Sequence, residues 1–173
     1  MRHPAALVIL ALTHLAGAQE TTLKKPLISS GLGGRELTFL TSANENGVLL
    51  NYLAETAKAK ASGEQFRAVA DLLGSTQQKE NDRLVQLAAN KGKTFPAQTP
   101  ATLKKIQAKL EPLSGPEFDA ACGAEFKRVL DQVAANCELG AKAADPDIKA
   151  FAEQGLAMTK DKLGVVNKLV QQK

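Results

Sequence analysis

The sequence is poor in aromatic residues: its 173 residues include no tryptophan, one tyrosine and six phenylalanines, 4% in total. A surface that stacks nucleic-acid bases, or an aromatic platform for sugars, needs more rings than this. Lysine and arginine number 22 and aspartate and glutamate 18, so the net charge is +4, and no block of five like charges occurs. This mixed, mildly basic balance argues against a nucleic-acid partner.

Histidine is even scarcer. The sequence has only two histidines, His3 and His14, and both lie in a segment with the features of a signal peptide. Residues 1–18 have a positive start, an apolar stretch and small residues before Gln19, a pattern typical of a cleaved secretory signal. We therefore expect a periplasmic or secreted bacterial protein that begins near Gln19. A short uncleaved anchor is the alternative, although the apolar stretch is too short for a comfortable membrane span and nothing later is apolar enough.

Cleavage near Ala18 would leave a chain with no histidine, with 21 basic and 18 acidic residues and a net charge of +3. Histidine-based acid–base catalysis, Ser-His-Asp triads and imidazole metal ligands are then excluded. We expect the protein not to be an enzyme.

Two cysteines remain, Cys122 and Cys137, 15 positions apart in the sequence. If one continuous helix carries both, they are about 22 Å apart, whereas a disulfide needs Cα atoms within about 7 Å. We predict two reduced, buried thiols that pack as small apolar side chains. Pairing with a second chain is left open.

Apolar and small residues recur at steps of three and four along most of the chain, and no strand-like alternation is present. This period predicts four long helices and one short one, after a lead-in rich in Pro, Ser and Gly at residues 19–34. The expected helices cover residues 35–61, 63–90, 100–110, 116–142 and 146–173. Four long helices of similar length predict an all-α antiparallel bundle over residues 35–173, with one short extra helix between long helices 2 and 3. A three-helix bundle with a detached helix is the alternative.

Several helix starts carry capping signals. Ser62 with Gln65, and Ser114 with Glu117, match the capping-box spacing. Asp145 precedes a proline and is expected to cap the last helix.

The blocks FLTSANENGVLLNYLAETAKAKAS, FRAVADLL and FDAACGAEFKRVLDQVAANCELGAKAADPDIKAFAEQGL resemble the bacterial family called domain of unknown function 4142. The resemblance covers residues 35–170 and implies a secreted, ferritin-like helical bundle. The activity of such proteins is generally unassigned, so the resemblance implies a fold more than a function.

The resemblance also implies inward-pointing metal ligands: a glutamate on the first long helix and a histidine on each of the other three. This sequence has Leu50, Gln77, Leu130 and Lys162 at those places. Leucine cannot bind a metal, lysine adds a positive charge, and a single glutamine is a weak ligand. We therefore expect a former metal site, with no metal and no cofactor.

Gln77 and Glu80 fall on the otherwise apolar stripe of the second helix. A charge buried alone is costly, so Glu80 needs a partner or water. The family pattern brings the second and fourth long helices together, and we predict a Glu80–Lys162 pair with Gln77 or Asn81 hydrogen-bonded nearby. The alternative is a stripe that borders solvent.

Two further features remain. Glu125 lies beside the apolar stripe around Cys122 and is the other carboxylate of interest, although a solvated helix face is the ordinary interpretation. In a helix, the segment 102–110 places its leucines and isoleucine on one side and its lysines elsewhere. This amphipathic pattern suits packing on the bundle end or contact with an anionic surface.

The sequence favours a non-catalytic structural or protein-interaction module, such as an accessory subunit, with a protein partner. A metal-binding or redox bundle that uses carboxylates only is the second hypothesis. A protein that binds envelope polymers is the third.

Overall fold

The computed structural model describes residues 31–95 and 99–171, so the predicted signal peptide and most of the predicted lead-in lie outside the described residues. The described part forms helices and contains no strand. The helices are α1 (Gly34–Lys60), α2 (Glu64–Asn90), α3 (Ala101–Leu110), α4 (Gly115–Gly140) and α5 (Pro146–Gln171). The predicted all-α fold class is confirmed, and each predicted helix of the described part is present within a few residues of its expected bounds.

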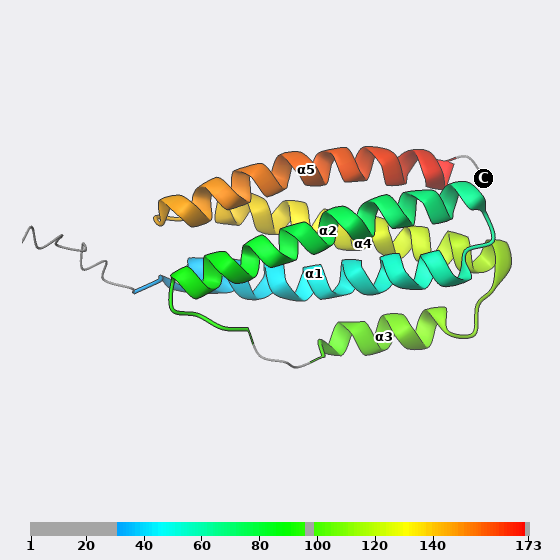
Figure 1. Ribbon diagram of the computed structural model, residues 1–173, viewed down its shortest axis with the longest axis horizontal. Helices are drawn as coiled ribbons and strands as arrows, with labels where there is room; N and C mark the ends of the chain where they lie inside the picture. The colour runs from blue at the N-terminus through cyan, green and yellow to red at the C-terminus, as the bar shows by residue number, and fades with distance from the viewer. Residues whose placement is uncertain (1–30, 96–98, 172–173) are drawn as a thin grey trace, which may run out of the picture.

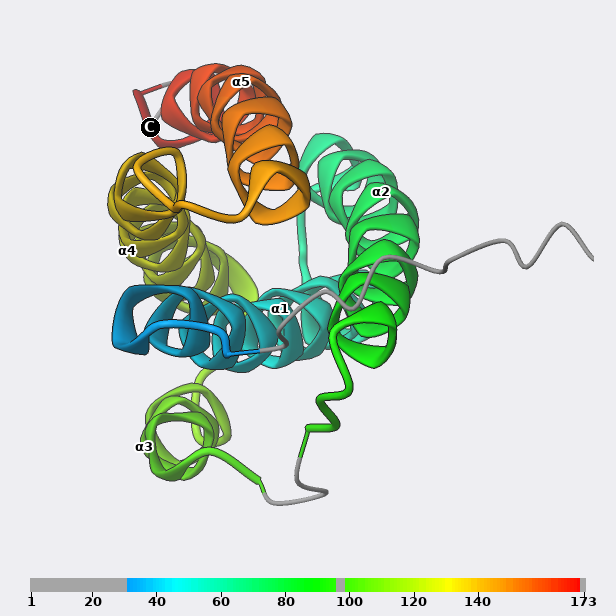
Figure 2. The ribbon, with the colours of Figure 1, turned by 90° about the vertical axis from the view of Figure 1, so that its left-hand side faces the viewer.

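The four long helices form an antiparallel bundle in which α1 packs against α2 and α4, and α5 packs against α4 and less closely against α2 (Figure 1). Viewed along the bundle, α3 lies outside it, below α1 and α4 (Figure 2). Helices α2 and α4 run in the same direction, so the chain must cross the length of the bundle between them. The segment that contains α3 makes this crossing.

The apolar core is divided into two clusters along the bundle axis. The larger one includes Leu53, Phe118 and Val129, all of which are fully enclosed. The smaller one surrounds Phe39 and Ile148 at the other end. Burial of this apolar area is the main favourable term for the fold.

A polar layer lies between α2 and α5, near the middle of both helices. We define this layer by Gln77 and Glu80 on α2 and by Thr159 and Lys162 on α5; all except Glu80 are buried. Two further buried amides, Asn46 on α1 and Asn136 on α4, lie outside this layer. A buried polar group is costly without a partner, so the hydrogen bonds of this layer decide what it can do.

Helix starts show where the sequence prediction was wrong. Gly63, not Ser62, caps α2, and no side chain of its own segment caps that end. Instead Asp119 of α4 accepts hydrogen bonds from the Ser62 and Gly63 amides, both at 3.1 Å, and from the Ser62 hydroxyl at 2.7 Å. Ser114 is the N-cap of α4 but makes no side-chain cap bond.

The opposite end of the bundle is closed by local and long-range bonds. Asp145 caps α5 as predicted, because its Oδ1 accepts from the amides of Asp147 and Ile148 at 3.0 and 3.1 Å. Lys91, at the end of α2, pairs with Asp145 at 2.7 Å. Glu36 of α1 accepts a hydrogen bond from the Ala144 amide at 2.8 Å, which lowers the pKa of the Glu36 carboxyl.

The short helix α3 is fixed to the bundle through its apolar face. Leu103, Ile106 and Leu110 are buried in the larger cluster. Lys109 of α3 also forms an ion pair with Glu125 of α4 at 2.7 Å. The apolar side of α3 is therefore used for packing, as one of the two sequence interpretations predicts, but α3 lies along the side of the bundle and not at its end (Figures 1 and 2).

Candidate functional site

The polar layer brings together the residues predicted from the sequence as a buried pair. The Lys162 ammonium lies 2.8 Å from Glu80 Oε1, and it also donates to Gln77 Oε1 at 3.0 Å. Gln77 Nε2 in turn donates to Asn81 Oδ1 at 2.9 Å. The cluster is thus a continuous chain of hydrogen bonds that links α5 to α2.

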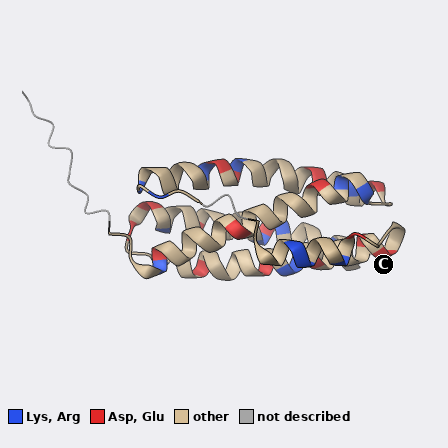
Figure 3. Cartoon of the chain, turned by 90° about the horizontal axis from the view of Figure 1, so that it is seen from below, with Lys and Arg blue, Asp and Glu red and all other residues tan. Residues whose placement is uncertain are grey.

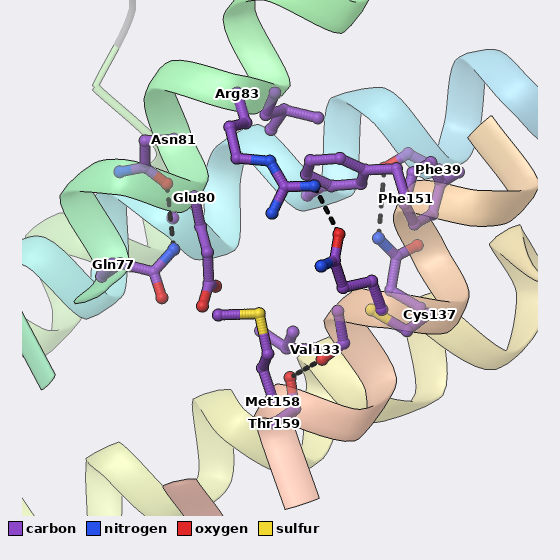
Figure 4. Close-up of a pocket in the computed structure, with 16 residues that line it drawn as sticks. Phe39, Gln77, Glu80, Asn81, Arg83, Val133, Cys137, Phe151, Met158 and Thr159 are labelled. Atoms are coloured by element: carbon purple, nitrogen blue, oxygen red, sulfur yellow. Dashed lines mark hydrogen bonds between the residues drawn. The ribbon is translucent and has the colours of Figure 1, made fainter. Parts of the chain in front are cut away.

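Helix geometry explains why α2 can offer three partners. Residues three and four apart share one face of a helix, so Gln77, Glu80 and Asn81 point in a common direction. Figure 4 shows Gln77, Glu80 and Asn81 descending from neighbouring turns of α2, with Met158 and Thr159 of α5 opposite. Gly47 of α1 makes room for Asn81, since a Cβ there would lie 2.2 Å from Asn81 Oδ1.

A small cavity of about 40 Å³ adjoins this cluster and is lined by residues of α1, α2, α4 and α5. Such a volume holds about three water molecules, which is too small for an organic substrate. Arg83 closes one side: it donates a hydrogen bond to Gln154, and its guanidinium lies 5.6 Å from the Phe151 ring centroid. Apart from the Glu80 carboxylate, which is paired with Lys162, the nucleophilic groups of covalent catalysis in the lining are those of Cys137 and Thr159.

Neither of those groups is activated. Burial raises the pKa of the Cys137 thiol to about 11, so it is protonated at neutral pH. The Thr159 hydroxyl donates to the Gly155 carbonyl of its own helix at 2.7 Å. Cys122 lies elsewhere in the core, where burial raises its pKa to about 12. Both cysteines are free and buried, which confirms that prediction.

The two leucines named from the resemblance do not reach the cavity. Leu50 and Leu130 are buried in the larger apolar cluster, 4% and 1% exposed. Of the four positions, Gln77 and Lys162 are hydrogen-bonded to each other, and Leu50 and Leu130 belong to the same apolar cluster.

The donor set does not fit a ferritin-like metal centre. Such a centre needs several carboxylate or imidazole ligands, whereas the polar layer offers one carboxylate, already bound to an ammonium group. Over the described ranges, no group of three His, Cys, Asp or Glu residues is placed to hold a metal ion.

Glu125 is buried but does not lie in a catalytic cleft. Burial acts to raise the pKa of its carboxyl, yet hydrogen bonds from Lys109 and Arg128, both at 2.7 Å, lower it below the ordinary value. Its visible role is to fasten α3 to α4.

Sequence reasoning missed Asn46 and Asn136. Asn136 Nδ2 donates to the Phe39 carbonyl at 3.1 Å and so joins α4 to α1. Asn46 precedes Gly47 and Asn136 precedes Cys137, and both of these neighbours lie on predicted apolar stripes. This position next to an interior face was the sequence signal that could have predicted their burial.

Comparison with known families identifies the chain. The family described as "Domain of unknown function (DUF4142)" matches residues 28–169. The chain belongs to this family. No curated protein matches its sequence. The resemblance read from the sequence motifs is confirmed.

Solved structures similar to this DUF4142 chain show the same fold at low sequence identity. A Streptomyces coelicolor protein described as secreted and as DUF305 has a TM-score of 0.68 at 10% identity, covering 80% of this chain and 93% of its own. A Bacillus halodurans protein described as a spore coat protein has a TM-score of 0.64 at 18% identity, covering 80% and 87%. Dps from Thermosynechococcus elongatus has a TM-score of 0.59 at 16% identity, covering 78% and 89%. The fold is therefore ferritin-like.

No helix in residues 31–95 and 99–171 is both long enough and apolar enough to cross a membrane.

Proposed function

We propose that this DUF4142 protein is an exported, non-catalytic helical bundle that works as a binding module through its outer surface. One observation carries the proposal: the polar centre of the bundle is occupied by its own bonds. Lys162 holds Glu80 and Gln77, and no activated nucleophile lines the adjoining cavity.

The distribution of charge is consistent with this role. Basic and acidic residues are interspersed along the four long helices in Figure 3, whereas the short α3 carries three lysines and no acidic residue. Such a surface favours specific contacts with a protein over bulk electrostatic attraction to a polyanion. The secreted and spore coat descriptions of two similar structures agree with a surface protein outside the cytoplasm.

Metal analysis tests the non-catalytic part of the proposal. The protein is purified after export from cells grown with added iron, manganese and zinc, and metal per chain is measured by mass spectrometry. We expect less than about 0.1 metal per chain, because the layer's one carboxylate is bound to Lys162. Stoichiometric metal that is lost in Glu80→Ala and kept in Glu138→Ala, an exposed carboxylate on α4, would support the carboxylate-only metal hypothesis instead.

Export is tested separately. Cell fractionation and intact-mass measurement should find a periplasmic or secreted chain that begins at Gln19. A chain that keeps residues 1–18 in the cytoplasmic fraction would contradict the exported assignment.

A further inference from the structure

The sulfur of Met158 lies at the small cavity beside the polar layer. Met158 is partly exposed and is one of the α5 residues that line this cavity. Figure 4 shows its sulfur on the cavity side of α5, facing Glu80 of α2. The other methionine of the chain is Met1, which lies outside the described residues. Met158 is therefore the only thioether in residues 31–95 and 99–171.

A thioether is a reducing group that needs no activation. A thiol reacts with oxidants as its thiolate, and burial raises the pKa of the Cys137 thiol, which lines the same cavity, to about 11. The thioether of methionine has no proton to lose, and an oxidant that reaches it converts it to the sulfoxide. Of the two sulfur atoms at this cavity, that of Met158 should therefore react first.

The size of the cavity selects the oxidant. Its volume of about 40 Å³ holds about three water molecules. Hydrogen peroxide is about as large as two waters and fits this space. An aromatic oxidant such as chloramine-T does not fit. Arg83, which is bonded to Gln154, also closes one side of the cavity to larger molecules.

The lining can hold a peroxide molecule in place of water. Hydrogen peroxide donates through both of its hydroxyl groups and accepts through both oxygens. Glu80 Oε1 is bonded to Lys162, which leaves Glu80 Oε2 to accept. Asn81 Oδ1 accepts from Gln77, which leaves Asn81 Nδ2 to donate. The guanidinium group of Arg83 adds a positive charge that favours the departure of hydroxide from the peroxide.

We propose that Met158 is an oxidation site and that hydrogen peroxide reaches it through this cavity. The sulfur lone pair forms a bond to one peroxide oxygen as the O–O bond breaks. The proton of the transferred hydroxyl group passes to the departing hydroxide, which leaves as water. Sulfur loses two electrons and the peroxide gains them, so the products are methionine sulfoxide and water. This inference is independent of the proposed binding function.

The cavity also has room for the product. The sulfoxide carries one additional oxygen, which takes the place of about one water molecule and can accept a hydrogen bond. Asn81 and Arg83 line the same cavity as donors. Oxidation should therefore leave the bundle folded and shift its melting temperature by less than about 3 °C, whereas a sulfoxide in a dry core would disrupt the packing.

The test compares a small and a large oxidant. The purified protein is treated with hydrogen peroxide or with chloramine-T, together with a free peptide of residues 155–161 as the reference, and mass spectrometry follows the addition of one oxygen to each. With hydrogen peroxide we expect Met158 of the protein to react within about threefold of the peptide rate, because the cavity admits the oxidant. With chloramine-T we expect the protein to react at least about tenfold more slowly than the peptide.

The outcomes that overturn the proposal follow from the same data. Protection of Met158 from both oxidants would show that the cavity does not admit peroxide. Reaction at the peptide rate with both would show that the sulfur is reached from the open surface. Oxidation of Cys137 before Met158, located by peptide mapping, would also contradict it, as would unfolding of the protein once Met158 is oxidised.

Matched variants separate the cavity from the thioether itself. Met158→Leu should abolish the addition of one oxygen. Adding Leu130→Met to that variant places a thioether in the larger apolar cluster at a position only 1% exposed, away from the cavity. We expect this methionine to react with hydrogen peroxide at least about thirtyfold more slowly than Met158. Leu53→Met, at a fully buried position, gives the same comparison if Leu130→Met does not fold. Equal rates for the buried and the native methionine would mean that the cavity has no role and that the proposal is wrong.

Discussion

Replacing Lys162 by methionine tests whether the polar layer is a true cross-link between α2 and α5. The substitution keeps most of the side-chain volume and removes the ammonium group from Glu80 and Gln77. Lys162 and Glu80 side chains are 9% and 16% exposed, so little water is available to replace the lost partner. We expect a large loss of stability and no change in helix content.

The magnitude follows from the geometry. At 2.8 Å, Coulomb's law with an effective dielectric constant of about 20 gives an attraction of about 6 kcal/mol. Desolvation offsets part of this attraction, and breaking a buried pair by removing one partner costs about 3–5 kcal/mol. For a domain of this size the melting temperature should fall by roughly 6–20 °C.

The assay is urea and thermal unfolding followed by circular dichroism, with Lys160→Met as the control. Lys160 is exposed on the same helix and makes no ion pair among the described residues. The double variant Glu80→Met/Lys162→Met should regain most of the loss, because an apolar pair replaces an ionic one without leaving a lone charge. If Lys162→Met costs no more than Lys160→Met, or if the double variant is the least stable of all, the reasoning is refuted.

Three other predictions concern packing, capping and thiol reactivity. Asp119→Ala should lower the free energy of unfolding by about 2–4 kcal/mol in urea titrations, because three donors lose their acceptor; a loss below about 0.5 kcal/mol would contradict this. Gly140→Ala should destabilise by about 1–3 kcal/mol, since a Cβ there would meet the Phe39 ring at 2.4 Å, whereas Gly164→Ala, with open space, should be neutral or stabilising by up to about 1 kcal/mol. Cys122 and Cys137 should react with a thiol reagent only after unfolding, and rapid reaction of either in the native protein would show that its burial is wrong.

The fold could be predicted because the helical period is strong and long. The stripe that begins Phe118–Cys122–Phe126 continues to Cys137, over about five turns, and burial follows it closely. The prediction was wrong where a distant residue competes with a local one. Ser62 has the local signal of a helix cap, but its amide and hydroxyl both bond to Asp119 on another helix, a contact that one-dimensional spacing does not contain.

The candidate site divides in the same way. Gln77, Glu80 and Lys162 could be found because each interrupts an apolar stripe with a group that needs a partner. The burial of Asn46 could not be found, because it depends on how α1 and α4 pack in three dimensions. Asn46 looks like an ordinary polar helix residue in the sequence, but the packing of α1 against α4 leaves it only 9% exposed.

The position of Lys162 has a consequence for how the bundle is held together. A metal ion between helices links them only while it is bound, so the packing then depends on metal supply and pH. Here the cation is part of α5 itself, and its bonds to Glu80 and Gln77 of α2 form as the helices pack. Because α2 and α5 pack less closely than the other adjacent pairs, this seam gains most from a polar link. The link joins α2 to α5 without an ion taken from solution.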